Sequence, residues 1–188
     1  MKKSELRSIY KSKRNQLSEV EIHECSRKIL ENLKKMPIWE KSVFHVFVPI
    51  VQNHEINTFP IIEFLLTQNK TVLVPKVVGK KMISCRIDKG TEWTTGKFGV
   101  PEPIDCIEFE NKKIEVVLQP MLICDRLGNR IGYGGGYYDR FLSEFQIQPL
   151  KIGLNFFPSI PKIEEVEPTD VRLDYCVTGD EIVSFSTF

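Results

Sequence analysis

Short apolar runs that alternate with helical segments constrain the fold of this chain more than any other feature. Residues 43–48 are β-branched and aromatic, which predicts a buried strand that the following proline ends. Residues 71–74 form a second run of this kind, again followed by a proline. Between them, residues 58–66 are typical of a helix, because a threonine and a proline at its start precede closely spaced apolar side chains. A strand, a helix and a second strand make a βαβ unit, which implies a largely parallel sheet.

Further elements are expected on both sides of this unit. A helix is predicted over residues 3–17, because Leu6, Tyr10 and Leu17 share one stripe at helical spacing. A second helix begins at Ser18, where Glu21 completes a capping box, and a proline ends it. The other predicted elements are an edge strand or hairpin arm at 81–87, strands at 114–118, 151–154 and 175–178, and a helix at 137–145. We expect an α/β fold, a single domain over residues 1–188 with three α/β/α layers and a mostly parallel central sheet.

Length and charge exclude several classes of protein. A chain of 188 residues is long enough for one compact domain with a substantial core. No apolar run approaches the length of a membrane span, and the charged N-terminus does not resemble a secretory signal. The formal net charge of +1 provides no overall attraction for nucleic acid. We therefore expect a cytoplasmic protein, with a monomer as the expected state and neither nucleic acid nor membrane as a partner.

Cysteine and histidine spacing gives no sign of a structural metal. The five cysteines are scattered and form no C-x-x-C pair, so free thiols are expected. The three histidines lack the spacing of zinc ligands.

The segment at residues 130–140 carries the strongest functional signal. It holds four glycines within five positions, between arginines and ahead of a Tyr-Tyr-Asp-Arg run. A backbone without Cβ atoms can turn its N–H groups toward an anion, and guanidinium groups can neutralise the charge of that anion. The segment lacks the Gly-Lys-Ser/Thr end of a P-loop and the third glycine of a dinucleotide fingerprint. It is a candidate polyphosphate site, and a flexible turn that only begins a helix is the alternative.

Basic residues of the first predicted helix have two interpretations. Lys3, Arg7, Lys11 and Arg14 lie on one stripe at helical spacing. Such a stripe is usually a solvated surface. It would bind phosphate only if it faced the glycine loop, where each cation could pair with a phosphate oxygen.

The acidic and aromatic candidates are similarly ambiguous. Asp139, in a first helical turn, suits either the helix dipole or a magnesium ion. Asp170 and Asp174 are spaced to bind a metal or to cap a turn, and a solvated acidic loop is the alternative. Glu55 could cap the helix that follows it. Phe98 lies in a glycine- and proline-rich loop, where an aromatic ring either packs locally or stacks on a flat ligand. Because strand ends converge at one edge of a parallel sheet, we expect these segments to meet in a common crevice.

Taken together, these motifs resemble one family. Residues 130–140 are similar to the signature of 5-formyltetrahydrofolate cyclo-ligases. Weaker matches at residues 3–7, 55–58, 99–103 and 169–178 follow in that family's order. The resemblance departs at residues 155–158, to which we assign no function.

This resemblance implies an ATP- and magnesium-dependent cyclisation of 5-formyltetrahydrofolate to 5,10-methenyltetrahydrofolate, with release of ADP and phosphate through a phosphorylated formyl group. The residues that it implies for ATP are Lys3, Ser4, Glu5, Leu6, Arg7, Arg130, Ile131, Gly132, Tyr133, Gly134, Gly135, Gly136, Tyr137 and Tyr138, with Arg130 and Tyr138 catalytic. Those that it implies for the folate, which could be polyglutamylated, are Ile50, Glu55, Phe98, Tyr133, Gly134, Gly135, Gly136 and Tyr137. Asp139 and Asp170 are implied as ligands of Mg²⁺.

Two other functions are compatible with parts of the sequence. One is a phosphate-binding sensor of the same architecture without ATP turnover, which would not need the acidic pair Asp139 and Asp170. The other is an RNA-binding module that uses the basic helix. The near-neutral charge and the lack of an aromatic-rich basic strand disfavour RNA.

Overall fold

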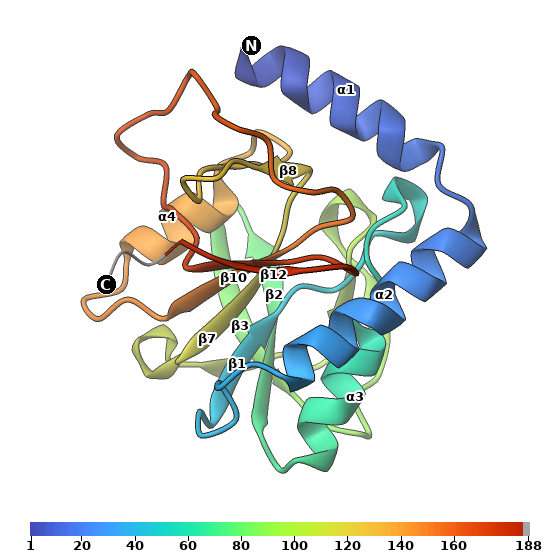
Figure 1. Ribbon diagram of the computed structural model, residues 1–188. Helices are drawn as coiled ribbons and strands as arrows, with labels where there is room; N and C mark the ends of the chain where they lie inside the picture. Colours follow the sequence, from blue (N-terminus) through green and yellow to red (C-terminus); the bar gives the residue numbers. More distant parts are fainter. Residues whose placement is uncertain (186–188) are drawn as a thin grey trace.

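An eight-stranded sheet runs through the centre of the molecule (Figure 1). This computed structural model describes residues 1–185. The five mutually parallel strands are β1 (Val43–Val46), β2 (Thr71–Val78), β7 (Val116–Pro120), β10 (Leu150–Leu154) and β11 (Tyr175–Val177). The antiparallel strands are β3 (Lys81–Ile87), β6 (Ile107–Phe109) and β12 (Ile182–Ser184). The order β12-β11-β10-β7-β1-β2-β3-β6 confirms the predicted α/β fold with a mostly parallel sheet.

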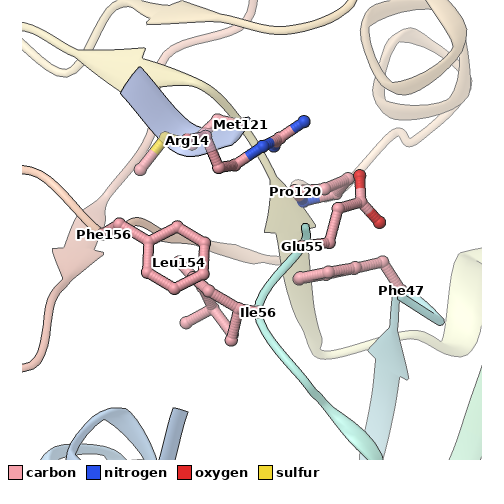
Figure 2. Close-up of a pocket in the computed structure, with 8 residues that line it drawn as sticks. All are labelled: Arg14, Phe47, Glu55, Ile56, Pro120, Met121, Leu154 and Phe156. Carbon is pink, nitrogen blue, oxygen red and sulfur yellow. The ribbon is translucent and has the colours of Figure 1, made fainter. Parts of the chain in front are cut away.

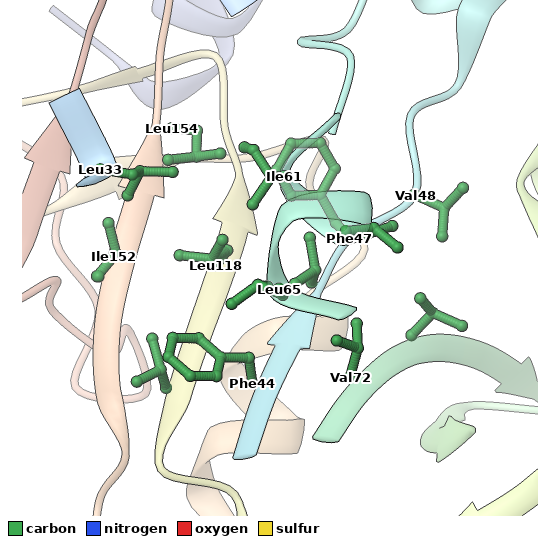
Figure 3. Packing of buried hydrophobic residues seen from close by; sticks show 14 of the residues in the cluster. Leu33, Phe44, Phe47, Val48, Ile61, Leu65, Val72, Leu118, Ile152 and Leu154 are labelled. Atoms are coloured by element: carbon green, nitrogen blue, oxygen red, sulfur yellow. The ribbon is translucent and has the colours of Figure 1, made fainter. Parts of the chain in front are cut away.

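Helices cover both faces of this sheet. Side chains alternate along β1, so Phe44 and Val46 join the core beneath α2 (Glu19–Lys34) and α3 (Phe59–Thr67) (Figure 3). His45 points to the opposite face, where its ring centroid lies 4.9 Å from that of Phe141 in α4 (Tyr137–Ser143). The three predicted layers are therefore confirmed. The capping box of α2 is also confirmed, because Ser18 accepts from the backbone N–H of Glu21.

The first helix, α1 (Lys3–Asn15), lies across one end of the sheet (Figure 1). It ends earlier than the predicted residue 17. Leu6 anchors it in a separate apolar cluster with Ile123 of β8 (Ile123–Cys124) and Ile131 of β9 (Arg130–Ile131). Because β8 and β9 follow directly on β7, this contact holds α1 beyond the carboxyl end of the parallel strands.

The strand at 71–74 proves longer than predicted. β2 continues through Pro75 to Val78, and Pro75 pairs with Ser84 of β3. The pairing of β2 with β1 ends at Leu73, two residues before Pro75. The lack of a backbone N–H at the proline therefore costs no hydrogen bond on that side of the strand. β3 is an inner strand and a hairpin arm, because β6 covers its other edge.

Short elements that the sequence did not reveal complete the chain. They are β4 (Trp93–Thr95), β5 (Pro101–Pro103) and the 3₁₀ turns η1 (Val51–Asn53), η2 (Lys97–Gly99) and η3 (Asn111–Lys113). None of the helices in residues 1–185 is both long enough and apolar enough to span a bilayer.

The expectation of five free cysteines is wrong. Cys85 of β3 and Cys106 form a disulfide, with 5.0 Å between their Cα atoms. β6, which begins one residue after Cys106, pairs with β3 and brings the two thiols together. Cys25, Cys124 and Cys176 remain unpaired.

Candidate active site

The glycine loop lies between β9 and α4, where its backbone adopts conformations that favour glycine. Gly134 has a φ of +94° and Gly136 a φ of +63°. Gly136 also occupies the N-cap position of α4. The four glycines therefore serve a folded loop of defined shape, and the alternative of a merely flexible turn does not describe it.

A buried carboxylate organises the turn that leads into β9. Asp125 accepts hydrogen bonds from the backbone N–H groups of Leu127, Asn129 and Ile163, and from the side-chain amide of Asn129. These bonds tie the turn to the segment around Ile163. Asp125 was not among the predicted residues, although an Asp commonly binds the backbone N–H two positions further on and so marks a turn, as Asp125 does with Leu127.

Basic residues of α1 face the glycine loop. Arg7 donates from Nε to the carbonyl oxygen of Gly132 at 3.0 Å, and its guanidinium lies against Gly134. Lys3 forms a salt bridge with Asp170. The condition set for a functional basic stripe, contact with the glycine loop, is met by Arg7 and by Arg14, which binds the Tyr133 hydroxyl. Lys3 binds Asp170 instead, and Lys11 is exposed.

The other predicted residues of α1 have structural positions. Glu5 accepts from the backbone N–H of Lys2 and so caps the helix. Ser4 is exposed, and Leu6 is buried in the cluster beneath α1. Their assignment to ATP remains a prediction.

Arg130 and Asp139 form the central ion pair of the site. Nη2 of Arg130 lies 2.8 Å from Oδ1 of Asp139, and the side chain of Arg130 is only 6% exposed. Arg130 also donates to the carbonyl of Val171, and Asp139 accepts from the backbone N–H of Val171 at 3.1 Å. This network brings the segment that carries Asp170 next to the start of α4.

The two predicted magnesium ligands are consequently neighbours in space. Mg²⁺ is commonly held by one or two carboxylates together with phosphate and water oxygens, so the donor set of Asp139 and Asp170 fits that ion. In the structure each carboxylate is paired with a cation, Asp139 with Arg130 and Asp170 with Lys3. No cluster of three or more His, Cys, Asp or Glu side chains suited to a metal occurs within residues 1–185.

Glu55 lies at the carboxyl end of β1 and is only 6% exposed. One of its oxygens accepts from the backbone N–H of Ile50 at 2.7 Å, and the other accepts from the hydroxyl of Tyr133. Burial raises the pKa of the Glu55 carboxyl, while these two hydrogen bonds and the positive charge of Arg14 oppose the rise. Of the two predicted folate contacts, Glu55 thus meets a residue of the glycine loop, and Ile50 is joined to Glu55 through its backbone N–H.

A small cavity adjoins Glu55 (Figure 2). Its volume is about 10 Å³, and its lining residues are Arg14, Phe47, Glu55, Ile56, Pro120, Met121, Leu154 and Phe156. One charged residue of each sign therefore faces a largely apolar enclosure. Phe156 belongs to the segment 155–158, to which no function had been assigned.

Phe98 and Tyr137 form the outer edge of the site. Their ring centroids are 6.0 Å apart, and Phe98 is 61% exposed. Phe98 also has a φ of +62°, a conformation that is strained for an aromatic residue. The assignment of Phe98 to the folate remains a prediction.

Beneath the loop lies a group of buried polar side chains. The hydroxyl of Tyr138, both ring nitrogens of His45 and the side-chain amide of Gln119 have no hydrogen-bond partner in the described part of the chain. Burial raises the pKa of Tyr138 and lowers that of His45 to about 3. The catalytic role of Tyr138 remains a prediction.

Comparison with known proteins identifies the family. The 5-formyltetrahydrofolate cyclo-ligase family matches residues 1–179. The chain belongs to this family. It is 25% identical to the probable 5-formyltetrahydrofolate cyclo-ligase of Schizosaccharomyces pombe, over 97% of this chain and 98% of that one. It is 24% identical to the 5-formyltetrahydrofolate cyclo-ligase of Haemophilus influenzae, over 77% and 80% of the two chains.

Solved structures support the same assignment. The 5,10-methenyltetrahydrofolate synthetase of Aquifex aeolicus superimposes with a TM-score of 0.87 at 28% identity, covering 100% of this chain and 95% of that one. The corresponding protein of Mycoplasma pneumoniae shares the fold, with a TM-score of 0.74 at 24% identity over 95% and 99% of the two chains. This cyclo-ligase family member is therefore an enzyme of the ligase class.

Arg14 was predicted only as a member of the basic stripe and not as a site residue. It is 2% exposed, and its Nη2 lies 2.5 Å from the hydroxyl of Tyr133. A signal was available, because Arg14 follows Leu6 and Tyr10 at steps of four and therefore falls on the buried stripe of α1. An arginine on an apolar stripe indicates a buried position with a hydrogen-bond partner.

Proposed function

We propose that this protein uses ATP and Mg²⁺ to cyclise 5-formyltetrahydrofolate to 5,10-methenyltetrahydrofolate, releasing ADP and phosphate. Membership of the cyclo-ligase family supports the reaction class. The single observation that carries the proposal is the contact of Arg7 with the glycine loop. It joins an amide-rich backbone and a guanidinium at the carboxyl end of a parallel sheet, where ligands bind in folds of this type.

In this proposal the polyphosphate of ATP lies along the glycine loop. Backbone N–H groups around Gly134 and Gly136 bind its oxygens, and Arg7 and Lys3 add positive charge from α1. Both cations would exchange part of their present contacts for phosphate, Lys3 leaving Asp170 and Arg7 leaving Gly132. Arg130 is held rigidly by Asp139 and Val171 and so presents a fixed charge to the transferring group.

Asp139 and Asp170 are the residues that would hold Mg²⁺. When bound, the ion would neutralise charge on the phosphates. Arrival of the ion would also free Lys3 for the nucleotide, because Lys3 and the ion compete for the same carboxylate.

The chemistry needs little acid–base work from side chains. The formyl oxygen attacks the terminal phosphorus, so an O–P bond forms while the bond between that phosphorus and the ADP oxygen breaks. N10 of the folate then attacks the formyl carbon, which closes the five-membered ring, and its proton passes to water or to the departing phosphate. The C–O bond breaks and phosphate leaves. Positioning of the two substrates and neutralisation of charge by Arg130, Arg7 and Lys3 account for catalysis.

An absorbance assay tests this function. Purified protein is mixed with 5-formyltetrahydrofolate, ATP and MgCl₂, and the near-ultraviolet band of the methenyl product is followed. We expect the band to grow, and to stay absent when ATP is omitted or when a chelator removes Mg²⁺. Folate binding without any product under the complete conditions would instead favour a sensor without turnover.

A further inference from the structure

The guanidinium of Arg14 is buried, and not all of its hydrogen-bond donors have an acceptor. Its Nε has no hydrogen-bond partner within residues 1–185, although the residue is 2% exposed. A buried donor without a partner is costly in free energy, so its persistence points to a partner that is not part of the chain. Arg14 lines the cavity beside Glu55 (Figure 2), and that cavity is where such a partner would bind.

Tyr133 bridges Arg14 and Glu55 in the free protein. Its hydroxyl accepts a hydrogen bond from Nη2 of Arg14 and donates one to the Glu55 carboxylate. A single polar group thus satisfies a donor on one side and an acceptor on the other. Any ligand that replaces it must offer the same pair of functions, an acceptor for Arg14 and a donor for Glu55.

The local backbone allows Tyr133 to be replaced. Glycines precede and follow it, and a Cβ at Gly132 would meet nothing within 4 Å. Tyr133 itself is 38% exposed, so its ring can leave toward solvent without crossing the core. Its departure leaves the place between Arg14 and Glu55 open, and these are the two charged residues that line the cavity of about 10 Å³.

The other residues that line this cavity are mostly apolar. They include Phe47, which directly follows β1, Leu154 at the end of β10, and the aromatic Phe156. A small number of polar groups in an apolar enclosure is the usual composition of a small-molecule site. Here the polar groups are one guanidinium and one carboxylate.

We propose that Arg14 and Glu55 together bind the cyclic amide edge of a fused heterocycle, and that the Tyr133 hydroxyl occupies this place in the free protein. The inference rests on the proposed function, because the pterin ring of 5-formyltetrahydrofolate carries an N–H beside a carbonyl oxygen. The N–H donates to Glu55, and the 4-oxo group accepts from Arg14. Arg14 is thereby a specificity residue for the oxo form of the ring.

Equilibrium binding without turnover tests this assignment. Calorimetry measures the affinity of the intact protein for 5-formyltetrahydrofolate in the absence of ATP, and separately for ATP with Mg²⁺. The variants are Arg14→Met and Tyr133→Phe, with Lys13→Met as a control that removes an exposed cation from the same helix. We expect Arg14→Met to weaken folate binding by about tenfold or more while ATP affinity changes less than about twofold. Tyr133→Phe should bind folate as tightly as the wild type or more tightly, because no hydroxyl has to be displaced.

A matched ligand pair tests the atom that Arg14 binds. The 4-thioxo counterpart of 5-formyltetrahydrofolate keeps the ring N–H for Glu55 and carries sulfur, a weaker hydrogen-bond acceptor, in place of the 4-oxo oxygen. The wild type should prefer the oxo ligand by about tenfold or more, and Arg14→Met should lose most of that preference. Should Arg14→Met fail to fold in a melting experiment, Arg14→Lys, which keeps the charge and a donor but not the planar fork, should lose part of the preference. An unchanged preference in that variant would overturn the role of Arg14.

The outcomes separate this inference from the function on which it rests. Failure of the wild type to bind 5-formyltetrahydrofolate at all would overturn both. Normal folate binding by Arg14→Met, or an unchanged preference between the two ligands, would overturn the role of Arg14 and leave the cyclo-ligase function intact.

Discussion

Arg7 donates a hydrogen bond from Nε to the carbonyl oxygen of Gly132 at 3.0 Å, linking the first helix to the glycine loop across most of the chain. The same guanidinium restricts Gly134, because a Cβ at that position would lie 3.2 Å from Cζ of Arg7. The loop and α1 therefore form one unit, and a change at Gly134 should be felt by the nucleotide that we expect there.

Gly134→Ala should reduce both stability and nucleotide affinity. Its φ of +94° is unfavourable for alanine, at a cost of about 1 kcal/mol or more in unfolding free energy. The added methyl group also displaces Arg7, so the affinity for ATP measured by calorimetry should fall by roughly tenfold. Gly79→Ala is the matched control, because Gly79 has a φ of +62° but open space around it. It should lose similar stability and keep its affinity for ATP, and an equal loss of affinity in both variants would contradict the role of the loop.

Asp139→Asn should abolish turnover while preserving most of the fold. The amide oxygen can still accept from Arg130 and from the backbone N–H of Val171, so the unfolding free energy should fall by only about 1–2 kcal/mol. The lost charge removes a magnesium ligand, and kcat in the absorbance assay should drop at least about 100-fold at any Mg²⁺ concentration. Asp180→Asn, at an exposed position near the last strand pair, is a charge-matched control. A loss of activity no larger than the loss of folded protein would show that Asp139 is only structural.

His45 should make the protein sensitive to acid. Burial lowers its pKa from 6.5 to about 3 in the folded state, so below pH 6.5 the unfolded chain binds a proton that the folded chain excludes. The contribution of neutral His45 to stability is complete above pH 6.5 and is lost as the pH falls toward 3. Between pH 7 and pH 5 the wild type should lose roughly 2 kcal/mol of unfolding free energy relative to His45→Leu, measured in urea.

The exposed His23 provides the control for this effect. His23→Gln should follow the wild-type dependence on pH, because it replaces an exposed histidine and leaves His45 and its surroundings in place. Parallel curves for the wild type and His45→Leu would show that the His45 ring reaches water in solution.

Thiol titration should count three reactive cysteines in the unfolded, unreduced protein and five after reduction. The difference is the disulfide between Cys85 and Cys106. Cys106→Ser should leave one further thiol on Cys85 and lower the unfolding free energy by about 3 kcal/mol, the scale for closing a loop of this length. Five thiols in protein purified without reductant would contradict the pairing.

The parts of the fold that were predictable depend on neighbours in the chain. Ser18 and Glu21 lie within one helical turn, so their residue types and spacing alone predict the capping box. The run at 43–48 needed only its β-branched composition to be recognised as a strand. Pro75 misled the prediction, because its effect on a strand depends on which side of the ladder is paired, and pairing is not a local property.

The candidate site divides in the same way. The sequence by itself determined that residues 130–140 form a glycine-rich loop ahead of a helix and predicted that this loop binds an anion, because glycine spacing and flanking charge act locally. Only the tertiary structure decided that Tyr133 bridges Arg14 and Glu55, since these residues are 119 and 78 positions apart. Such contacts depend on how α1, β1 and the loop pack at one end of the sheet, and that packing is settled by the burial of the whole core rather than by the residues that meet there.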